Sequence, residues 1–128
     1  MKAIFLDRDG IINKEVNYCH KISDFHFIED VFCSTKAMAE LGYKLFIFTN
    51  QAGIARGYYS ESDFLKLTDW MLGEFKKHGV DIAKVYYCPH HPDGVNKFAI
   101  SCDCRKPLPG MLLQAKMEFG IDMCQSIT

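Results

Sequence analysis

Two aspartates stand one residue apart near the start of the chain, at Asp7 and Asp9, directly after the apolar run 3–6. The run predicts a buried strand, and the alternation of side chains along it breaks where the chain turns at Gly10. Two carboxylates in different positions at a strand end can hold a metal, and one can act as a nucleophile while its neighbour transfers protons. Because Asp-x-Asp-Gly also occurs in calcium-binding loops, the assignment depends on the rest of the chain.

A second cluster combines three cysteines with a histidine. Cys88 and His90 are followed, after an eleven-residue gap, by Cys102 and Cys104. Three thiolates and one imidazole match a structural zinc site, and such clustering is rare by chance, so we predict that these four residues bind Zn²⁺. The alternatives are two unrelated buried cysteine pairs, or His91 in place of His90. Four protein ligands leave no open position, so the metal would hold the loop and take no part in the chemistry.

Three further segments carry polar groups that could meet a ligand. Residues 49–51 end the second β-rich run, where parallel sheets bind ligands, and a hydroxyl with backbone N–H groups there can hold a phosphate oxygen. Arg105 and Lys106 follow the last cysteine of the cluster, and a fixed loop would present both cations to anionic groups. Residues 53–57 form a glycine-bracketed turn with one cation, Arg56, and this turn could border a substrate. The alternatives are a polar turn, solvated surface charges and an ordinary loop.

The periodicity of apolar residues predicts strands that alternate with helices. One predicted helix has an apolar face with Val31, Met38 and Leu41, and another has a stripe with Phe64, Leu67, Met71 and Phe75. Ser60 and Asp63 resemble a capping box, and Gly42, Gly79 and Gly120 are placed to end helices. The expected elements are strands at 2–6, 44–48 and 84–87, helices at 30–41, 60–78 and 109–119, and a loop over 88–106. This order predicts an α/β fold with a parallel sheet and right-handed crossovers.

Size and composition suggest one cytoplasmic domain. The chain has 128 residues, and its net charge of −1 gives no reason to expect a nucleic-acid or membrane-surface partner. We find no signal peptide and no run of the ~18 apolar residues that a membrane helix needs. Six cysteines are many for a reducing compartment, where clustered cysteines more often bind metal than form disulfides.

Taken in order, these motifs resemble the heptose bisphosphate phosphatases of the haloacid-dehalogenase superfamily, in the branch with a histidinol-phosphatase-like zinc loop. The resemblance covers essentially all 128 residues, and the zinc loop is its most specific part. It implies a haloacid-dehalogenase-like Rossmannoid parallel sheet with a minimal cap, as a single core domain over 1–128 with the zinc loop at 88–106. Histidinol-phosphate phosphatase is the alternative, although that domain lacks the stretch 53–57 and the doubled histidine.

The resemblance also implies an activity and roles for individual residues. The enzyme would be a Mg²⁺-dependent phosphomonoesterase that removes the 7-phosphate of D-glycero-D-manno-heptose 1,7-bisphosphate. Asp7 would be the nucleophile, Asp9 the acid and base, and both would bind Mg²⁺, the latter through its backbone carbonyl. Thr49 and Lys106 would stabilise the phosphoryl group. The substrate-binding residues would be Arg8, Asn13, Glu15, Val16, Asn17, Tyr18, Asn50, Gln51, Ala52, Arg56 and Arg105. The only partner expected is the small sugar bisphosphate, and the complete protein would be a monomer that serves surface-glycan synthesis.

One motif of this superfamily is missing from the sequence. Its fourth motif is a strand that ends in an aspartate, the third protein ligand of magnesium, and Asp122 precedes the place where that strand would begin. We therefore expect the chain to be C-terminally incomplete, as the first part of a longer phosphatase. A naturally shortened, catalytically impaired zinc-stabilised chain, or a non-catalytic binding module, is the alternative. The missing strand would also leave 3–6 at an open sheet edge.

Overall fold

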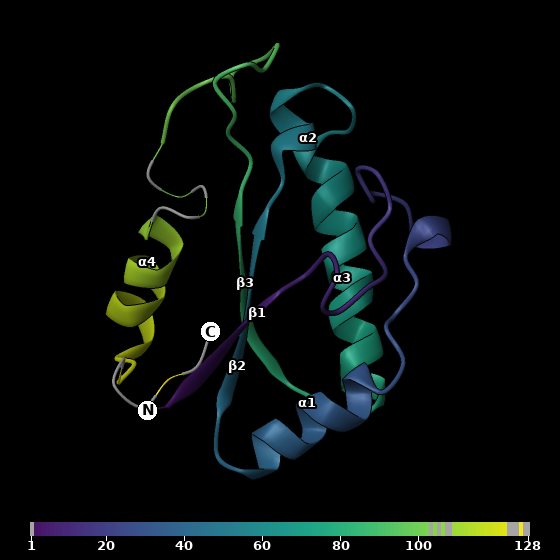
Figure 1. Ribbon diagram of the computed structural model, residues 1–128, viewed down its shortest axis with the longest axis vertical. Coiled ribbons are helices and arrows are strands. Elements are labelled where there is room, and N and C mark those ends of the chain that lie inside the picture. The colour runs from purple at the N-terminus through teal and green to yellow at the C-terminus, as the bar shows by residue number, and fades with distance from the viewer. Residues whose placement is uncertain (1, 103, 105, 107–108, 123–125, 127–128) are drawn as a thin grey trace.

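The computed structural model describes residues 2–102, 104, 106, 109–122 and 126 (Figure 1). Helices and strands alternate along the chain, as the periodicity predicts. The elements are β1 (Ala3–Asp7), η1 (Ile22–Asp24), α1 (Val31–Glu40), β2 (Lys44–Asn50), α2 (Ala52–Ala55), α3 (Glu61–Lys77), β3 (Ile82–Cys88) and α4 (Gly110–Phe119).

The three strands form one parallel sheet in the order β1-β2-β3. Phe5 of β1 lies opposite Phe46 of β2, and the register between β2 and β3 shifts once, between Leu45 and Phe46. The parallel α/β sheet expected from the sequence is therefore confirmed. Among the described residues β1 pairs only with β2, so it lies at an edge of this sheet.

Helices cover both faces of the sheet, with α1 and α3 on one side and α4 on the other (Figure 1). Alternate residues of one strand point to opposite layers: Leu45 and Ile47 pack with α3, whereas Phe46 and Phe48 pack with α4. Because both faces are covered, the strands read as continuous apolar runs. The helices on the two faces hold the strands in register, and they thereby fix the relative positions of the residues at the carboxyl ends of the strands.

Helix α3 follows its sequence signals closely. The Ser60 hydroxyl accepts from the Asp63 main-chain N–H, and the Asp63 carboxylate accepts from the Ser60 N–H, each at 3.0 Å. The predicted capping box is therefore present, and such a cap stabilises a helix by about 1 kcal/mol. The predicted apolar stripe is buried, namely Phe64, Leu67, Met71 and Phe75. Gly79, with φ +75°, follows its C-terminus.

Other boundaries differ from expectation. Helix α4 begins at Gly110, one residue after the predicted first helical residue Pro109, and Asp30 precedes α1 without making a side-chain cap. Helix α2 was not expected, because the glycines at 53 and 57 suggested a turn. Leu41, expected on the buried face of the first helix, is 68% exposed.

Within the described residues no helix has the length and apolar character needed to cross a membrane.

Candidate active site

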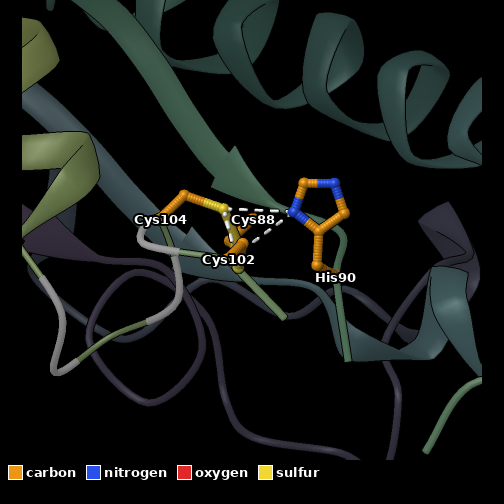
Figure 2. A group of neighbouring side chains, drawn as sticks. All are labelled: Cys88, His90, Cys102 and Cys104. Carbon is orange, nitrogen blue, oxygen red and sulfur yellow. Dashed lines mark hydrogen bonds between the residues drawn. A yellow bond between two sulfur atoms is a disulfide. The ribbon is translucent and has the colours of Figure 1, made fainter. Parts of the chain in front are cut away.

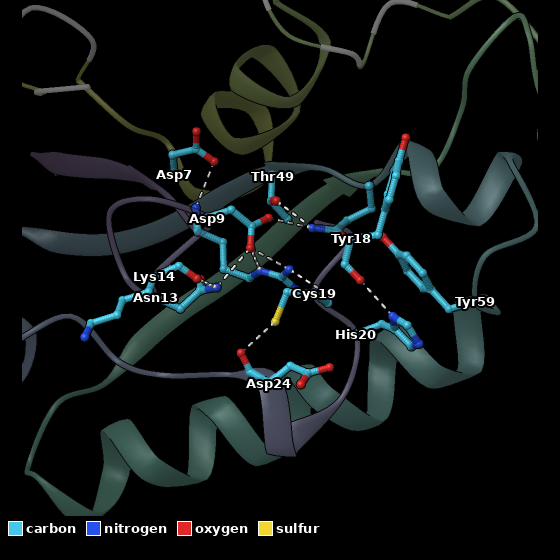
Figure 3. Close-up of polar contacts among 12 residues, drawn as sticks. Asp7, Asp9, Asn13, Lys14, Tyr18, Cys19, His20, Asp24, Thr49 and Tyr59 are labelled. Carbon is cyan, nitrogen blue, oxygen red and sulfur yellow. Dashed lines mark hydrogen bonds and ion pairs between the residues drawn. The ribbon is translucent and has the colours of Figure 1, made fainter. Parts of the chain in front are cut away.

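Asp7 and Asp9 lie at the carboxyl edge of the sheet, the first as the last residue of β1 and the second in the tight turn that follows (Figure 3). In this turn the Arg8 main-chain oxygen accepts from the Ile12 N–H at 2.8 Å. Gly10 has φ +92°, a conformation that side chains with a Cβ rarely adopt. The turn gives the two carboxylates different surroundings: the Asp7 side chain is 48% exposed and the Asp9 side chain 27%.

The Asp7 carboxylate is held on one side and open on the other. Its Oδ1 accepts from the Arg8 main-chain N–H at 2.8 Å and pairs with Lys106 Nζ at 3.0 Å. The same ammonium donates to the Phe48 main-chain oxygen at 3.1 Å. An ammonium beside an accessible carboxylate can hold a phosphoryl group close to the oxygen that would attack it.

Asn50, the last residue of β2, ties that strand to the main chain at Lys106. Its Oδ1 accepts from the Lys106 N–H at 2.9 Å, and its Nδ2 donates to the Lys106 carbonyl at 3.3 Å. One carboxamide therefore satisfies both main-chain groups of a residue that lies 56 positions away. These two bonds fix the position of the chain from which the Lys106 ammonium reaches Asp7.

The Asp9 carboxylate is bound by two buried side chains. Its Oδ1 accepts from Arg8 Nε at 3.1 Å, from Arg8 Nη2 at 2.8 Å and from Asn13 Nδ2 at 3.0 Å. Arg8 Nη2 also donates to the Cys19 carbonyl at 3.0 Å. The dashed lines in Figure 3 show these contacts converging on Asp9.

Gln51 connects Thr49, near the end of β2, to Asp9. Its Nε2 donates to Thr49 Oγ1 at 2.8 Å and lies 3.5 Å from Asp9 Oδ2. Its Oε1 accepts from the Tyr59 hydroxyl in a short hydrogen bond. Because the Thr49 oxygen accepts from Gln51, the Thr49 O–H stays available to donate to a ligand oxygen.

Burial sets the protonation of two neighbouring groups. It raises the pKa of Tyr59 to about 12, against the opposing effect of the Arg8 charge, so the phenol stays a hydrogen-bond donor at neutral pH. Burial also raises the pKa of the Cys19 thiol, which disfavours its reactive thiolate form.

A cleft of about 390 Å³ opens beside Asp9. Its other lining residues are Glu15, Val16, Asn17, Tyr18, Cys19, Asn50, Ala52, Gly53 and Tyr59. Six of the eleven residues expected to bind substrate therefore share one surface: the four at 15–18, together with Asn50 and Ala52. The sequence analysis did not select Cys19, Gly53 or Tyr59. The glycine-bracketed turn was the available signal for Gly53, since a Cβ there would overlap the Tyr59 ring.

The other expected substrate-binding residues lie elsewhere. Arg8, Asn13 and Gln51 are 1%, 0% and 3% exposed and do not line the cleft. Arg56 Nη2 lies 3.2 Å from His91 Nε2, a contact outside the cleft. Arg105 lies outside the described residues.

The structure brings the four predicted zinc ligands together in one cluster (Figure 2). One ligand atom from each of Cys88, His90, Cys102 and Cys104 lies within 4.8 Å of all the others. Cys102 Sγ is 3.3 Å from both Cys88 Sγ and Cys104 Sγ, and His90 Nδ1 is 3.4 Å from Cys104 Sγ. Three thiol groups and an imidazole are a donor set that suits zinc. Zn–S bonds of about 2.3 Å imply sulfur separations of about 3.8 Å in a tetrahedron, somewhat longer than the two separations at Cys102.

One bond in this cluster differs from the expectation of four free ligands. The structure joins Cys88 and Cys104 by a disulfide, with their Cα atoms 5.5 Å apart. The physical reason is that cysteines close enough to share an ion are also within the range of a disulfide. Zinc requires both as thiolates, so metal binding and this bond exclude one another.

The chain is similar to a known protein family and to several curated proteins. The family model described as polynucleotide kinase 3 phosphatase matches residues 2–126. A D-glycero-alpha-D-manno-heptose-1,7-bisphosphate 7-phosphatase of Photorhabdus laumondii is 52% identical over 99% of this chain and 70% of its own length. A D-glycero-beta-D-manno-heptose-1,7-bisphosphate 7-phosphatase of Yersinia pestis is 52% identical over 97% of this chain and 66% of its own. The chain thus spans about two thirds of the length of these relatives.

Solved structures show the same architecture. A haloacid-dehalogenase-like phosphatase of Mesorhizobium loti aligns with a TM-score of 0.92 and 33% identity, over 98% of this chain and 61% of its own. A D,D-heptose 1,7-bisphosphate phosphatase of B. bronchiseptica, complexed with magnesium and phosphate, aligns with a TM-score of 0.83 and 28% identity, over 96% of this chain and 66% of its own.

The parallel sheet, with its aspartate pair after the first strand and a lysine reaching the leading aspartate, defines a phosphatase of the haloacid-dehalogenase class. Within that class, the chain belongs to the family of heptose-1,7-bisphosphate 7-phosphatases.

Proposed function

We propose that this chain removes the 7-phosphate of D-glycero-D-manno-heptose 1,7-bisphosphate. The observation that carries the proposal is the half-exposed Asp7 carboxylate at the end of β1, with the Lys106 ammonium 3.0 Å away. The identity of about 50% to curated heptose bisphosphatases supports the substrate. Relatives named for the alpha and the beta anomer are equally similar, so the proposal covers both forms of the sugar.

The chain's own residues supply a two-step reaction. An Asp7 oxygen attacks phosphorus and forms an aspartyl-phosphate, while Asp9 gives a proton to the departing sugar oxygen. Asp9 then takes a proton from the water that hydrolyses this intermediate, so the same carboxyl group serves both steps. Lys106 and the free O–H of Thr49 hold the phosphoryl oxygens. The residues at 15–18 and Ala52 line the sugar-binding surface.

Two metals complete the proposal. The Asp7 carboxylate and the Asp9 main-chain carbonyl are oxygen donors that suit Mg²⁺, whose charge, when bound, offsets that of nucleophile and phosphate. The magnesium and phosphate in the B. bronchiseptica enzyme support this assignment. Cys88, His90 and the two following cysteines bind Zn²⁺ in reducing conditions, and this ion holds the loop that carries Lys106.

Phosphate release tests the activity. With Mg²⁺ present, the parent chain is expected to release phosphate from either anomer of the bisphosphate faster than from histidinol phosphate. Asp7→Asn should lower the rate by roughly a thousandfold or more while the far-UV circular dichroism stays unchanged. Asp69→Asn, which alters an exposed aspartate on α3, is the matched control and should keep the parent rate.

Two results would contradict the proposal. Equal rates for Asp7→Asn and the parent would remove Asp7 from the nucleophilic role. A clear preference for histidinol phosphate would favour the second phosphatase of the zinc-loop branch.

A further inference from the structure

Arg8 and Asn13 are fully buried, yet both direct N–H groups at the same oxygen of Asp9. Neither side chain lines the cleft, and both direct their N–H groups at Asp9, so these residues need an explanation other than contact with a substrate. We propose that the two oxygens of Asp9 have separate roles: Oδ1 is an anchored acceptor, Oδ2 carries the transferred proton, and Arg8 and Asn13 are positioning residues. The proposal rests on the proposed function and deepens it.

The hydrogen bonds at Oδ1 leave it no room for a proton. Three N–H groups point at this atom, from Arg8 Nε at 3.1 Å, Arg8 Nη2 at 2.8 Å and Asn13 Nδ2 at 3.0 Å. None of these groups can accept a hydrogen bond: the guanidinium only donates, and the Asn13 group is an amide NH₂. A proton on Oδ1 would have to displace one of these three N–H groups, and it would lie against the other two, which cannot accept its hydrogen bond.

The second oxygen has different surroundings. The contact found for Asp9 Oδ2 among the described residues is Gln51 Nε2, at the long distance of 3.5 Å. The Asp9 side chain is 27% exposed and lines the cleft, so Oδ2 can exchange a proton with a ligand there. The carboxyl group therefore has one oxygen that is fixed and one that is available.

Arg8 also resists reorientation of Asp9. Its side chain is only 2% exposed, its charge is paired with Asp9 Oδ1, and its guanidinium lies over the rings of Phe25 and Phe64. Rotating the carboxylate away would leave a buried cation without its counter-ion, which is strongly unfavourable. The aromatic contacts hold the guanidinium in place, so the anchor keeps its position whether or not a substrate is bound.

The hydrogen bonds from Arg8 and Asn13 to Asp9 Oδ1, which together form the anchor, are compatible with both steps of the reaction. When Oδ2 carries the proton, Oδ1 is a carbonyl oxygen and still accepts from Arg8 and Asn13. As the bond between phosphorus and the sugar oxygen breaks, the proton on Oδ2 passes to that oxygen, and Asp9 becomes a carboxylate. When water attacks the aspartyl-phosphate, Asp9 Oδ2 takes one proton from this water. Inorganic phosphate leaves, Asp7 is again a free carboxylate, and Asp9 is again a protonated carboxyl group.

Leaving groups of different acidity separate this role from a purely structural one. The departing sugar oxygen needs a proton, whereas the p-nitrophenolate leaving group of p-nitrophenyl phosphate does not. We would measure kcat/KM, which reports steps up to departure of the leaving group, for Asn13→Ala and Arg8→Lys with both substrates in Mg²⁺. For both variants, we expect the loss with the heptose bisphosphate to exceed that with the aryl phosphate by about tenfold or more. Asn13→Ser is the milder replacement if Asn13→Ala does not fold.

Thr35→Ala is the matched control. Thr35 is as buried as Asn13, and its hydroxyl donates to the Val31 carbonyl at 2.7 Å within α1, outside the cleft. Its removal should affect the two substrates equally. Equal losses on both substrates for Asn13→Ala and Arg8→Lys would overturn the separate roles of the two oxygens.

A stability measurement keeps the inference testable without turnover. In a double-mutant cycle of Asn13→Ala and Asp9→Ala, urea unfolding would measure the loss in free energy of unfolding for each variant. If Asn13 anchors Asp9, the double variant should lose less of this free energy than the sum of the two single variants. Additive losses would overturn the anchoring. If the parent cleaves neither substrate, the proposed function fails and this cycle alone decides whether Asn13 holds Asp9.

Discussion

Asn50→Ala should weaken catalysis by releasing Lys106, although Asn50 itself transfers no proton and makes no covalent bond. The variant removes both hydrogen bonds between the Asn50 carboxamide and the main chain of Lys106, at 2.9 and 3.3 Å. The ammonium would then reach Asp7 from a segment that is no longer held at the end of β2. The expected result is a lower kcat/KM with little change in global stability.

The size of the effect follows from these two bonds. A hydrogen bond contributes about 0.5–1.5 kcal/mol net, so the pair contributes about 1–3 kcal/mol to docking of the segment. This range corresponds to roughly 5- to 150-fold in the docking equilibrium. Both bonds are only partly buried and one is long, which places the expected loss of kcat/KM near the lower end, at about tenfold.

A second substitution tests the route of the effect. If Asn50 acts through Lys106, the double variant Asn50→Ala/Lys106→Met should be no slower than Lys106→Met alone. Asn96→Ala is the matched control, because Asn96 also makes two main-chain hydrogen bonds, to Ile54 and Phe98, but outside the cleft beside Asp9. Losses of Asn50→Ala and Lys106→Met that multiply in the double variant would refute this reasoning.

Three further predictions concern stability. Asp9→Ala should lower the free energy of unfolding by about 2 kcal/mol more than Asp7→Ala, because only the first leaves the buried Arg8 cation unpaired; equal losses in urea titrations would contradict this. Removing zinc with a chelator in reducing buffer should release about one ion per chain and lower the thermal midpoint, whereas an unchanged midpoint would count against a structural metal. Because the pKa of Tyr59 is raised to about 12, folded chains keep this proton where unfolded chains lose it, so stability should fall as pH rises from about 10 to 12; a fall of the same size in Tyr59→Phe would exclude Tyr59 as its source.

Much of the architecture followed from local signals in the sequence. The capping box at Ser60 and the stripe from Phe64 to Phe75 predicted α3 almost to the residue. The apolar runs predicted the strands. Both faces of the sheet are covered by helices, so the strands contain continuous apolar residues without alternating polar ones. Helix α2 was missed because residues 52–55 include a glycine and are too few to show the periodicity of a helix. Its residues are held by burial against other segments, which no local signal encodes.

The candidate site was predicted only in part. The family resemblance assigned Asp7 and Lys106 to the same phosphoryl group, and in the structure the Lys106 ammonium lies 3.0 Å from the Asp7 carboxylate. The direction in which the Arg8 and Asn13 side chains point could not be predicted, because it depends on the tight turn at Gly10 and on the burial of both side chains. Polar side chains beside a nucleophile suggest substrate contacts, but here they point inward.

The sequence by itself determined the order of strands and helices and the types of group available for chemistry, because these depend on residues close together in the chain. It also specified the four Cys and His side chains that cluster after β3, since their short spacings place two ligands on each arm. Only the tertiary structure decided which oxygen of Asp9 is anchored, that Asn50 grips Lys106, and that Cys88 lies within bonding distance of Cys104. The last two contacts join segments that are 56 and 16 residues apart in the chain, and the packed layers set their geometry by bringing strand ends together. Asn13 is only four residues from Asp9, and its contact depends on the tight turn at Gly10 and on burial of the side chain.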